Sequence, residues 1–127
     1  MMFIAGAGIF LGACSNVARK PLEGMWAIKS ITQDGKDISI GTFYINSIIL
    51  NADGTCDVPG SQTVDDTRGT WEIFSEDDRT VVTMKSKNPY FNGRFNLLVS
   101  PDDPSVIALQ SSRTTVTLHK FAFPMGN

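Results

Sequence analysis

The feature that most constrains this fold is a succession of short strand-like runs separated by turn residues. After Gly24, runs of aliphatic, β-branched and aromatic residues alternate with clusters of Asn, Asp, Gly, Pro and Ser. No segment shows a sustained helical period with capping residues at its ends. Short strands at near-regular spacing, with hairpin turns between them, are typical of β-sandwiches and β-barrels. The sequence therefore predicts an all-β domain.

Eight strands are predicted along the chain. Their ranges are 25–32, 43–50, 55–58, 69–74, 80–85, 94–99, 105–110 and 114–121. The turn after the second strand, Asn51-Ala52-Asp53-Gly54, is the clearest, because Gly adopts positive φ readily and Asn and Asp tolerate it. The segment 34–42 stays open. Its residues 37–41 fit a ninth short strand, a bulged start of the second strand or a loop at a barrel mouth.

Alternation of side chains predicts one buried face. Trp71 and Ile73 point one way, and Thr70 and Glu72 point the other. Short hairpins favour antiparallel neighbours. Eight such strands can close into a barrel that is either filled by side chains or holds one small ligand, and closure removes the exposed edges. We therefore predict an eight-stranded antiparallel up-and-down barrel.

The N-terminal segment has the layout of a secretory signal. An uncharged apolar run from Phe3 ends in Leu11-Gly12-Ala13-Cys14, and it is shorter than the roughly 20 apolar residues of a membrane-spanning helix. Leu11 to Cys14 resembles a bacterial lipobox. The resemblance implies a signal peptide at 1–13, cleavage before Cys14, a diacylglycerol on its sulfur, and a tether at 14–23. The alternative is a free cysteine that happens to end an apolar segment.

Lipidation at Cys14 would make a membrane the first partner of the chain. Ser15 follows the cysteine, in place of the Asp that typically marks inner-membrane retention, and no acidic run follows it. These residues predict the outer membrane and its periplasmic face. With Cys14 acylated, Cys56 has no partner for a disulfide and is expected to be a small buried hydrophobe. Without acylation, a Cys14–Cys56 disulfide becomes possible.

Composition argues against several classes of partner and reaction. The net charge of −2 gives no basic surplus for nucleic-acid phosphates. The one histidine, His119, cannot form a metal site with Cys56 alone. No Ser-hydrolase elbow and no Gly-rich phosphate loop occur. The paired carboxylates, such as Asp102-Asp103, lie in predicted turns. We expect no catalytic residue, no cofactor and no metal, and therefore no enzyme.

Two short motifs carry a family resemblance. Gly24-Met25-Trp26 opens the first predicted strand, and Gly69-Thr70-Trp71 opens another. A Gly-x-Trp at the start of strand one resembles the calycin and lipocalin signature. The wider spacing is similar to small lipocalin-like domains of Bacteroides-type lipoproteins, with the domain at 24–123. The resemblance implies that Trp26 plugs the closed end of a barrel and that small-ligand carriage is the function. Trp71 is also expected in the barrel-closing core.

The loop before the sixth predicted strand contains two adjacent aromatic residues. Tyr90 and Phe91 lie between Pro89 and Gly93. Aromatic rings on a loop can cover a barrel mouth or anchor a protein partner, so both are candidate binding residues. The alternative is that the rings fold back and close the barrel end.

Two functions are compatible with these features. The first is a membrane-anchored lipocalin-like barrel that binds a small apolar or amphipathic ligand, for which an open apolar interior of ~300 Å³ or more is the mark. The second is a protein-interaction or inhibitor-type lipoprotein. A filled interior with Tyr90 and Phe91 exposed would mark this second function.

The lipobox generates a direct test. Cys14→Ser should release the protein from the membrane fraction and abolish incorporation of labelled acyl chains, because the sulfur is the attachment atom. Fractionation and palmitate labelling measure both effects. A variant that stays with membranes, beside a wild type that takes up no label, would show that no anchor is attached at Cys14.

Overall fold

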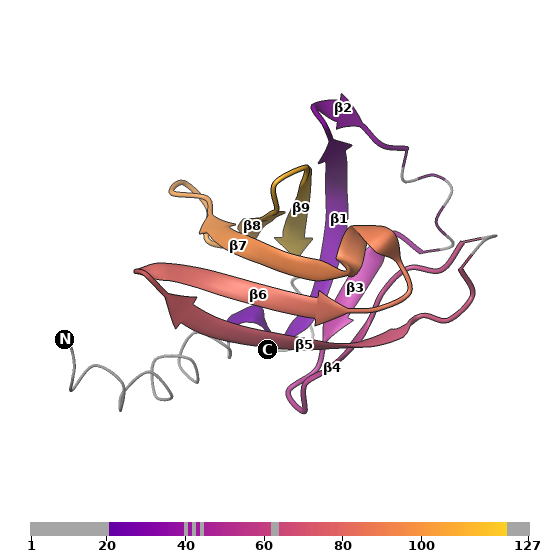
Figure 1. The fold of residues 1–127 in the computed structure, drawn as a ribbon, viewed down its shortest axis with the longest axis horizontal. Coiled ribbons are helices and arrows are strands. Elements are labelled where there is room, and N and C mark those ends of the chain that lie inside the picture. Colours follow the sequence, from indigo (N-terminus) through magenta and orange to yellow (C-terminus); the bar gives the residue numbers. More distant parts are fainter. Residues whose placement is uncertain (1–20, 40, 42, 44, 62–63, 122–127) are drawn as a thin grey trace.

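The computed structural model describes residues 21–39, 41, 43, 45–61 and 64–121 (Figure 1). Cys14 and the proposed signal segment lie outside these residues. The described chain forms one antiparallel sheet. Its strands are β1 (Gly24–Gln33), β2 (Lys36–Asp37), β3 (Ser47–Leu50), β4 (Thr55–Asp57), β5 (Arg68–Glu76), β6 (Arg79–Lys85), β7 (Gly93–Val99), β8 (Val106–Gln110) and β9 (Thr114–Lys120).

The sheet closes because β1 pairs with the last strand as well as with β3. The strand order is β2-β1-β3-β4-β5-β6-β7-β8-β9, with an additional β1–β9 pairing. On β1, Trp26 pairs with Lys120 at one end and Gln33 with Thr114 at the other. The hairpin strand β2 pairs only with the end of β1, so eight strands form the wall. The predicted eight-stranded antiparallel barrel is confirmed.

A bulge in β1 lets this one strand serve two neighbours. The β1–β9 register shifts between Ile28 and Ser30, so Lys29 is the extra residue. The first residues of β1, up to Ala27, also pair with β3. Beyond the bulge β1 leaves β3 and ends in the hairpin with β2. A bulge bends a strand and increases its twist, which is what a small barrel needs at a point where neighbours change.

Two regions differ from the sequence-based strand ranges. The predicted second strand at 43–50 is formed only over Ser47–Leu50, because Phe43 packs against the core at the barrel end instead. In the open segment, Lys36–Asp37 forms a short ninth strand. Asp34 and Gly35 turn between β1 and β2 with φ of 54° and 79°, the conformation of the hairpin turns that match strand twist.

Arg113 joins that hairpin to the neighbouring β8–β9 turn. Its guanidinium donates to both carboxylate oxygens of Asp34, at 3.1 and 2.7 Å, and its carbonyl accepts from the Asp34 amide at 2.8 Å. The two guanidinium hydrogen bonds hold the pKa of the Asp34 carboxyl below its usual value. Both side chains are exposed, so the contribution to stability is small.

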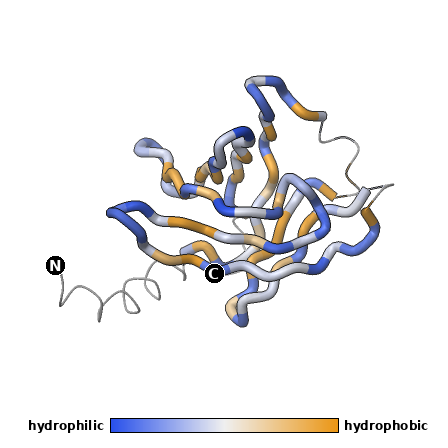
Figure 2. The backbone as a smooth tube through the Cα atoms, viewed as in Figure 1, coloured by the Kyte–Doolittle hydropathy of each residue, from blue (hydrophilic) through white to orange (hydrophobic). Residues whose placement is uncertain are grey.

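The core lies inside the wall, as the alternation predicts. Trp71 and Ile73 are buried while Thr70 and Glu72 are exposed. In Figure 2, hydrophobic residues recur along the strands and the β5–β6 turn is hydrophilic. Leu22, in the segment assigned to the tether, is 4% exposed and belongs to the core. Among the described residues, no helix is long and apolar enough to cross a membrane.

Both tryptophans lie at the end of the barrel where the chain enters. Each is 1% exposed. The Trp26 indole N–H donates to the Leu22 carbonyl at 2.8 Å, and that of Trp71 donates to the Asn51 carbonyl at 2.9 Å. The ammonium of Lys120 lies 5.3 Å from the centroid of the Trp26 ring. The rings therefore fill the core, and their polar edges are satisfied by the chain that covers this end.

Gly69 is required by a close approach of the backbone. A Cβ at this position would lie 2.3 Å from the Lys85 carbonyl oxygen and 3.2 Å from the Cys56 sulfur. A carbonyl held by the sheet cannot move aside as the end of a flexible side chain can. The Gly-Thr-Trp motif therefore combines a backbone contact at Gly69 with a core side chain two residues later.

We expect Trp26→Ala to lower the free energy of unfolding by ~3–5 kcal/mol, the range for truncating a buried aromatic residue. The lost indole leaves a cavity and an unpaired Leu22 carbonyl. Chemical denaturation followed by tyrosine fluorescence and circular dichroism measures the change. A variant with the wild-type unfolding midpoint would place Trp26 outside the core.

We also expect Gly69→Ala to destabilise the protein by about 2 kcal/mol or more, as overpacking against fixed neighbours does. Gly41→Ala is the matched control, since its nearest contact would be the Ser39 hydroxyl at 3.6 Å. Thermal denaturation of both variants gives the comparison. Equal melting temperatures for the two would show that the β5–β6 strands yield at Gly69.

Candidate functional site

The barrel interior is filled by side chains. The largest fully buried residues include Trp26, Trp71, Phe91 and Met84. Inward-facing residues from around the wall retain almost no accessible area: Ile28, Ile31, Ile48, Val82, Phe95, Ile107, Leu109, Val116 and Leu118. A ligand-sized cavity would leave accessible area on the side chains that line it. The described residues therefore enclose a packed core, which is one of the two options for eight strands.

The aromatic loop closes the barrel end opposite the tryptophans. Residues Pro89–Phe91 form a short 3-10 turn, η2, and Phe91 is 0% exposed. The expectation that Phe91 is a surface binding residue is therefore wrong, and the alternative that its ring folds back is correct. Burial of the ring in the core is strongly favourable and outweighs the freedom of the loop. Tyr90 is half-buried, with its ring centroid 6.2 Å from that of Phe43.

Hydrogen bonds hold this loop in place. The buried Asn88 side chain accepts from the Tyr90 amide and donates to the Pro59 carbonyl, both at 3.0 Å. The Ser86 hydroxyl donates to the Phe91 carbonyl at 2.8 Å. These contacts fix the loop against the segment that follows β4. The loop is therefore not arranged as a movable aromatic lid.

The remaining sequence candidates show no reactive arrangement. Cys56 is buried, and burial, with a smaller effect of the Asp57 carboxylate, raises the pKa of its thiol to about 11. It is therefore a protonated hydrophobic residue at neutral pH, as the sequence predicts. His119 is exposed. No group of three or more metal-ligating side chains occurs among the described residues.

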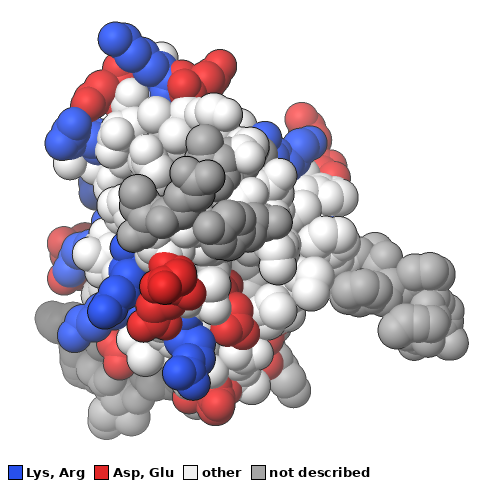
Figure 3. Space-filling view, turned by 90° about the vertical axis from the view of Figure 1, so that its right-hand side faces the viewer, with Lys and Arg blue, Asp and Glu red and all other residues white. Residues whose placement is uncertain are grey.

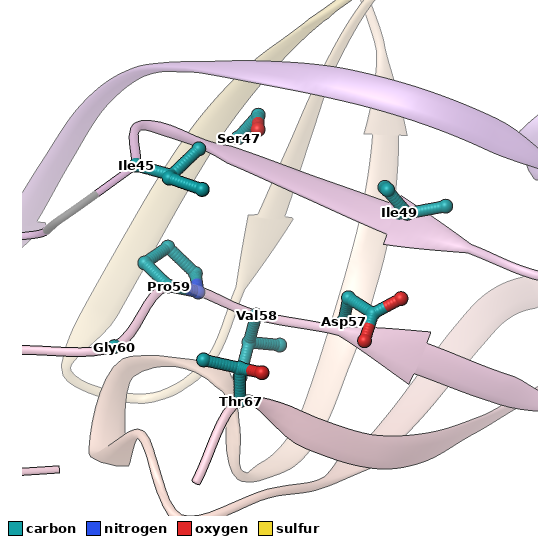
Figure 4. Close-up of a pocket in the computed structure, with 8 residues that line it drawn as sticks. All are labelled: Ile45, Ser47, Ile49, Asp57, Val58, Pro59, Gly60 and Thr67. Carbon is teal, nitrogen blue, oxygen red and sulfur yellow. The ribbon is translucent and has the colours of Figure 1, made fainter. Parts of the chain in front are cut away.

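A groove on the outside of the wall is the best candidate for a binding site. Its volume is about 360 Å³, and it lies between β3 and the chain that continues from β4 (Figure 4). Its lining comes from two short segments and one residue before β5: Ile45, Ser47, Ile49, Asp57, Val58, Pro59, Gly60 and Thr67. Figure 4 shows the first three along one side and Asp57, Val58 and Pro59 along the other.

Pro59 explains why the wall opens here. β3 and β4 pair through Ile49 and Asp57, so the next step of the antiparallel register places Ser47 opposite Pro59. Proline has no N–H to donate to the Ser47 carbonyl. The Pro59 carbonyl accepts from Asn88, and the Val58 amide donates to Thr67 at 2.8 Å. The chain after β4 therefore follows β5 and departs from β3.

The groove combines apolar walls with a few polar groups. Ile45 is 64% exposed, the most exposed large hydrophobic residue of the described chain. Asp57 is the one charged residue of the lining. A concave, mainly apolar site with a few polar groups is the usual form of a small-ligand site. The arrangement can bind and orient a ligand, but its lining offers no nucleophile paired with a base.

The sequence does not predict this groove, although it contains two signals for it. Ile48, Ile49 and Leu50 are consecutive, so a strand with one inward face must present Ile49 outward. Pro59 directly follows the predicted third strand, and a proline at this position ends the hydrogen-bond ladder between that strand and its neighbour. Neither signal identifies a groove without the register that places Ser47 against Pro59.

The charges on the neighbouring surface are mixed. Figure 3 shows the face at the right of Figure 1, where acidic and basic side chains lie beside one another around uncharged residues. This face therefore carries no large field of one sign that would steer a highly charged ligand.

Comparisons with known proteins bear on the fold. No protein-family profile and no curated protein sequence matches the chain. Its structure is similar to the crystal structure of a lipocalin-like protein from Bacteroides uniformis, with a TM-score of 0.52 and 16% sequence identity. The match covers 80% of this chain and 99% of that protein. Identity at this level establishes architecture alone, so the chain has a lipocalin-like barrel fold.

Proposed function

We propose that this chain is a non-catalytic binding protein that holds a small apolar or amphipathic ligand in the β3–β4 groove, outside the barrel. The observation that carries the proposal is the groove, which is apolar and open to solvent where the wall separates. Its volume of about 360 Å³ lies within the range of ligand pockets, roughly 300–1,000 Å³. The filled interior argues against the usual lipocalin arrangement with the ligand inside.

The proposal includes a membrane anchor at Cys14 and a location on the periplasmic face of the outer membrane. Support for both comes from Leu11 to Cys14 and from Ser15. The described chain begins at Pro21, so only a short segment separates it from Cys14. An anchored barrel would stay close to the bilayer surface, where amphipathic molecules are concentrated.

The second candidate is the protein-interaction function. The filled core favours it, and so does a shallow hollow of about 230 Å³ on the outside of β7 and β8. Leu98 and Val99 are exposed there, at 48% and 52%. The burial of Phe91 argues against the form of this function in which the aromatic loop binds the partner.

One pair of variants distinguishes the two surfaces. The uncharged fluorescent probe N-phenyl-1-naphthylamine should bind the wild type, and Ile45→Asn should weaken binding about tenfold, the effect of losing one apolar anchor. Val99→Asn is the control, because it replaces a similarly exposed aliphatic side chain at the other surface. Fluorescence titration measures both affinities.

If Val99→Asn weakens probe binding and Ile45→Asn does not, the binding site lies at β7 and β8. No probe binding by the wild type would contradict the proposed function. Both substitutions lie on the surface, so circular dichroism should show unchanged folding, and the titrations remain interpretable.

A further inference from the structure

The groove contains main-chain groups of β3 for which the described residues supply no hydrogen-bond partner. The Asn46 carbonyl accepts from Ile28 on β1, and antiparallel pairing alternates, so the amide and carbonyl of Ser47 face the other way. On that side the register places Pro59 opposite Ser47. Pro59 lacks the donor, and its carbonyl accepts from the Asn88 side chain and not from the Ser47 amide. No described residue therefore completes the ladder at Ser47.

An unpaired strand edge favours a ligand that brings its own donor and acceptor. Edge groups are templates for pairing with another chain, and an extended peptide supplies N–H and C=O at the spacing of a strand. A purely apolar ligand would fill the groove but leave the Ser47 groups unpaired, which is costly when water is displaced. The main-chain chemistry of the groove thus fits a peptide better than a hydrocarbon.

Side chains on either side of Ser47 add specificity for sequence. Ile49 on β3 and Ile45 just before it are each two residues from Ser47, and all three line the groove. An added strand would place alternate side chains next to these isoleucines. Two alternate apolar side chains of an extended peptide would therefore contact Ile45 and Ile49.

Charge gives the remaining feature of the ligand. Asp57 is the single charged residue of the lining, and it forms no ion pair with a described residue. Arg68 is its cross-strand neighbour on β5 and points along the same outer face without bonding to it. The Asp57 carboxylate can accept from a basic side chain at the inner end of the groove, where β3 and β4 still pair.

We propose that the β3–β4 groove binds a short extended amphipathic peptide by strand addition at Ser47, with apolar side chains against Ile45 and Ile49 and a basic side chain at Asp57. This inference rests on the proposed function and names the ligand class for the same groove. Pro59 is central to the site, since every other residue type has the main-chain N–H that proline lacks.

The test uses the blocked peptide acetyl-Val-Thr-Val-Lys-Val-amide with a fluorescein label, followed by fluorescence anisotropy. Its matched control carries N-methyl groups on the second and fourth residues, a second control carries them on the first and third, and side chains are unchanged in both. We expect one methylated peptide to bind at least tenfold more weakly, because methylation removes the N–H groups that face β3. Ile45→Asn should weaken the parent peptide by a similar factor.

Two further measurements locate the contact. Asp57→Asn should weaken the parent peptide about tenfold but leave the peptide with Gln in place of Lys unchanged. Hydrogen exchange of the Ser47 amide should slow when the parent peptide is added. Pro59→Val should lower peptide affinity by supplying the missing N–H, and Pro104→Val in an exposed turn should not.

The outcomes separate the inference from the function on which it rests. Equal affinity for parent and both methylated peptides, or unchanged exchange at Ser47, overturns strand addition. Probe binding that depends on Ile45, with no peptide binding, overturns the inference and leaves the proposed function standing. If neither the naphthylamine probe nor the peptide binds, both are wrong.

Discussion

The pairing of β1 with β9 is the interaction on which the rest of the structure depends. It joins the first strand to the last over the whole length of β9, and it converts an open meander into a barrel in which neither β1 nor β9 is left unpaired along that length. The inward faces of the strands then enclose one core from all sides. The bulge at Lys29 makes this possible, because it turns β1 away from β3 while the β9 ladder continues.

A closed wall with a filled interior moves the candidate site to the outside. Trp26 and Trp71 occupy one end of the barrel, and Phe91 occupies the other, so a ligand has no room between them. The strands of the wall separate where a single residue interrupts the hydrogen bonds between them. Pro59 cannot donate to Ser47, and the contacts of Asn88 and Thr67 hold the chain after β4 on the side of β5. One missing N–H thus turns a stretch of ordinary strand pairing into an apolar groove.

Much of the fold could be predicted from local sequence, and the candidate site could not. Alternation at Trp71 and Ile73 identified the buried face, and the Asn51 to Gly54 turn separated two strands as expected. For Tyr90 and Phe91, the local sequence could not predict whether the rings are buried. Their loop chemistry is the same whether the rings face solvent or the core. The buried side chain of Asn88, which ties the loop to Pro59, decides between the two, and that contact joins residues far apart in the chain.

The sequence by itself determined most of the strands, their antiparallel order and the buried face, because each depends on turn chemistry and on a period of two along the chain. Only the tertiary structure decided that the interior is packed and that the groove lies outside, since both depend on the sum of side-chain volumes and on cross-strand register. Ile45 and Ser47 have no special meaning in the sequence, and Pro59 there indicates only the end of a strand. They form a site because the strand register places Pro59 opposite the amide and carbonyl of Ser47. Proline cannot complete the hydrogen-bonded pair there, so the two chains separate.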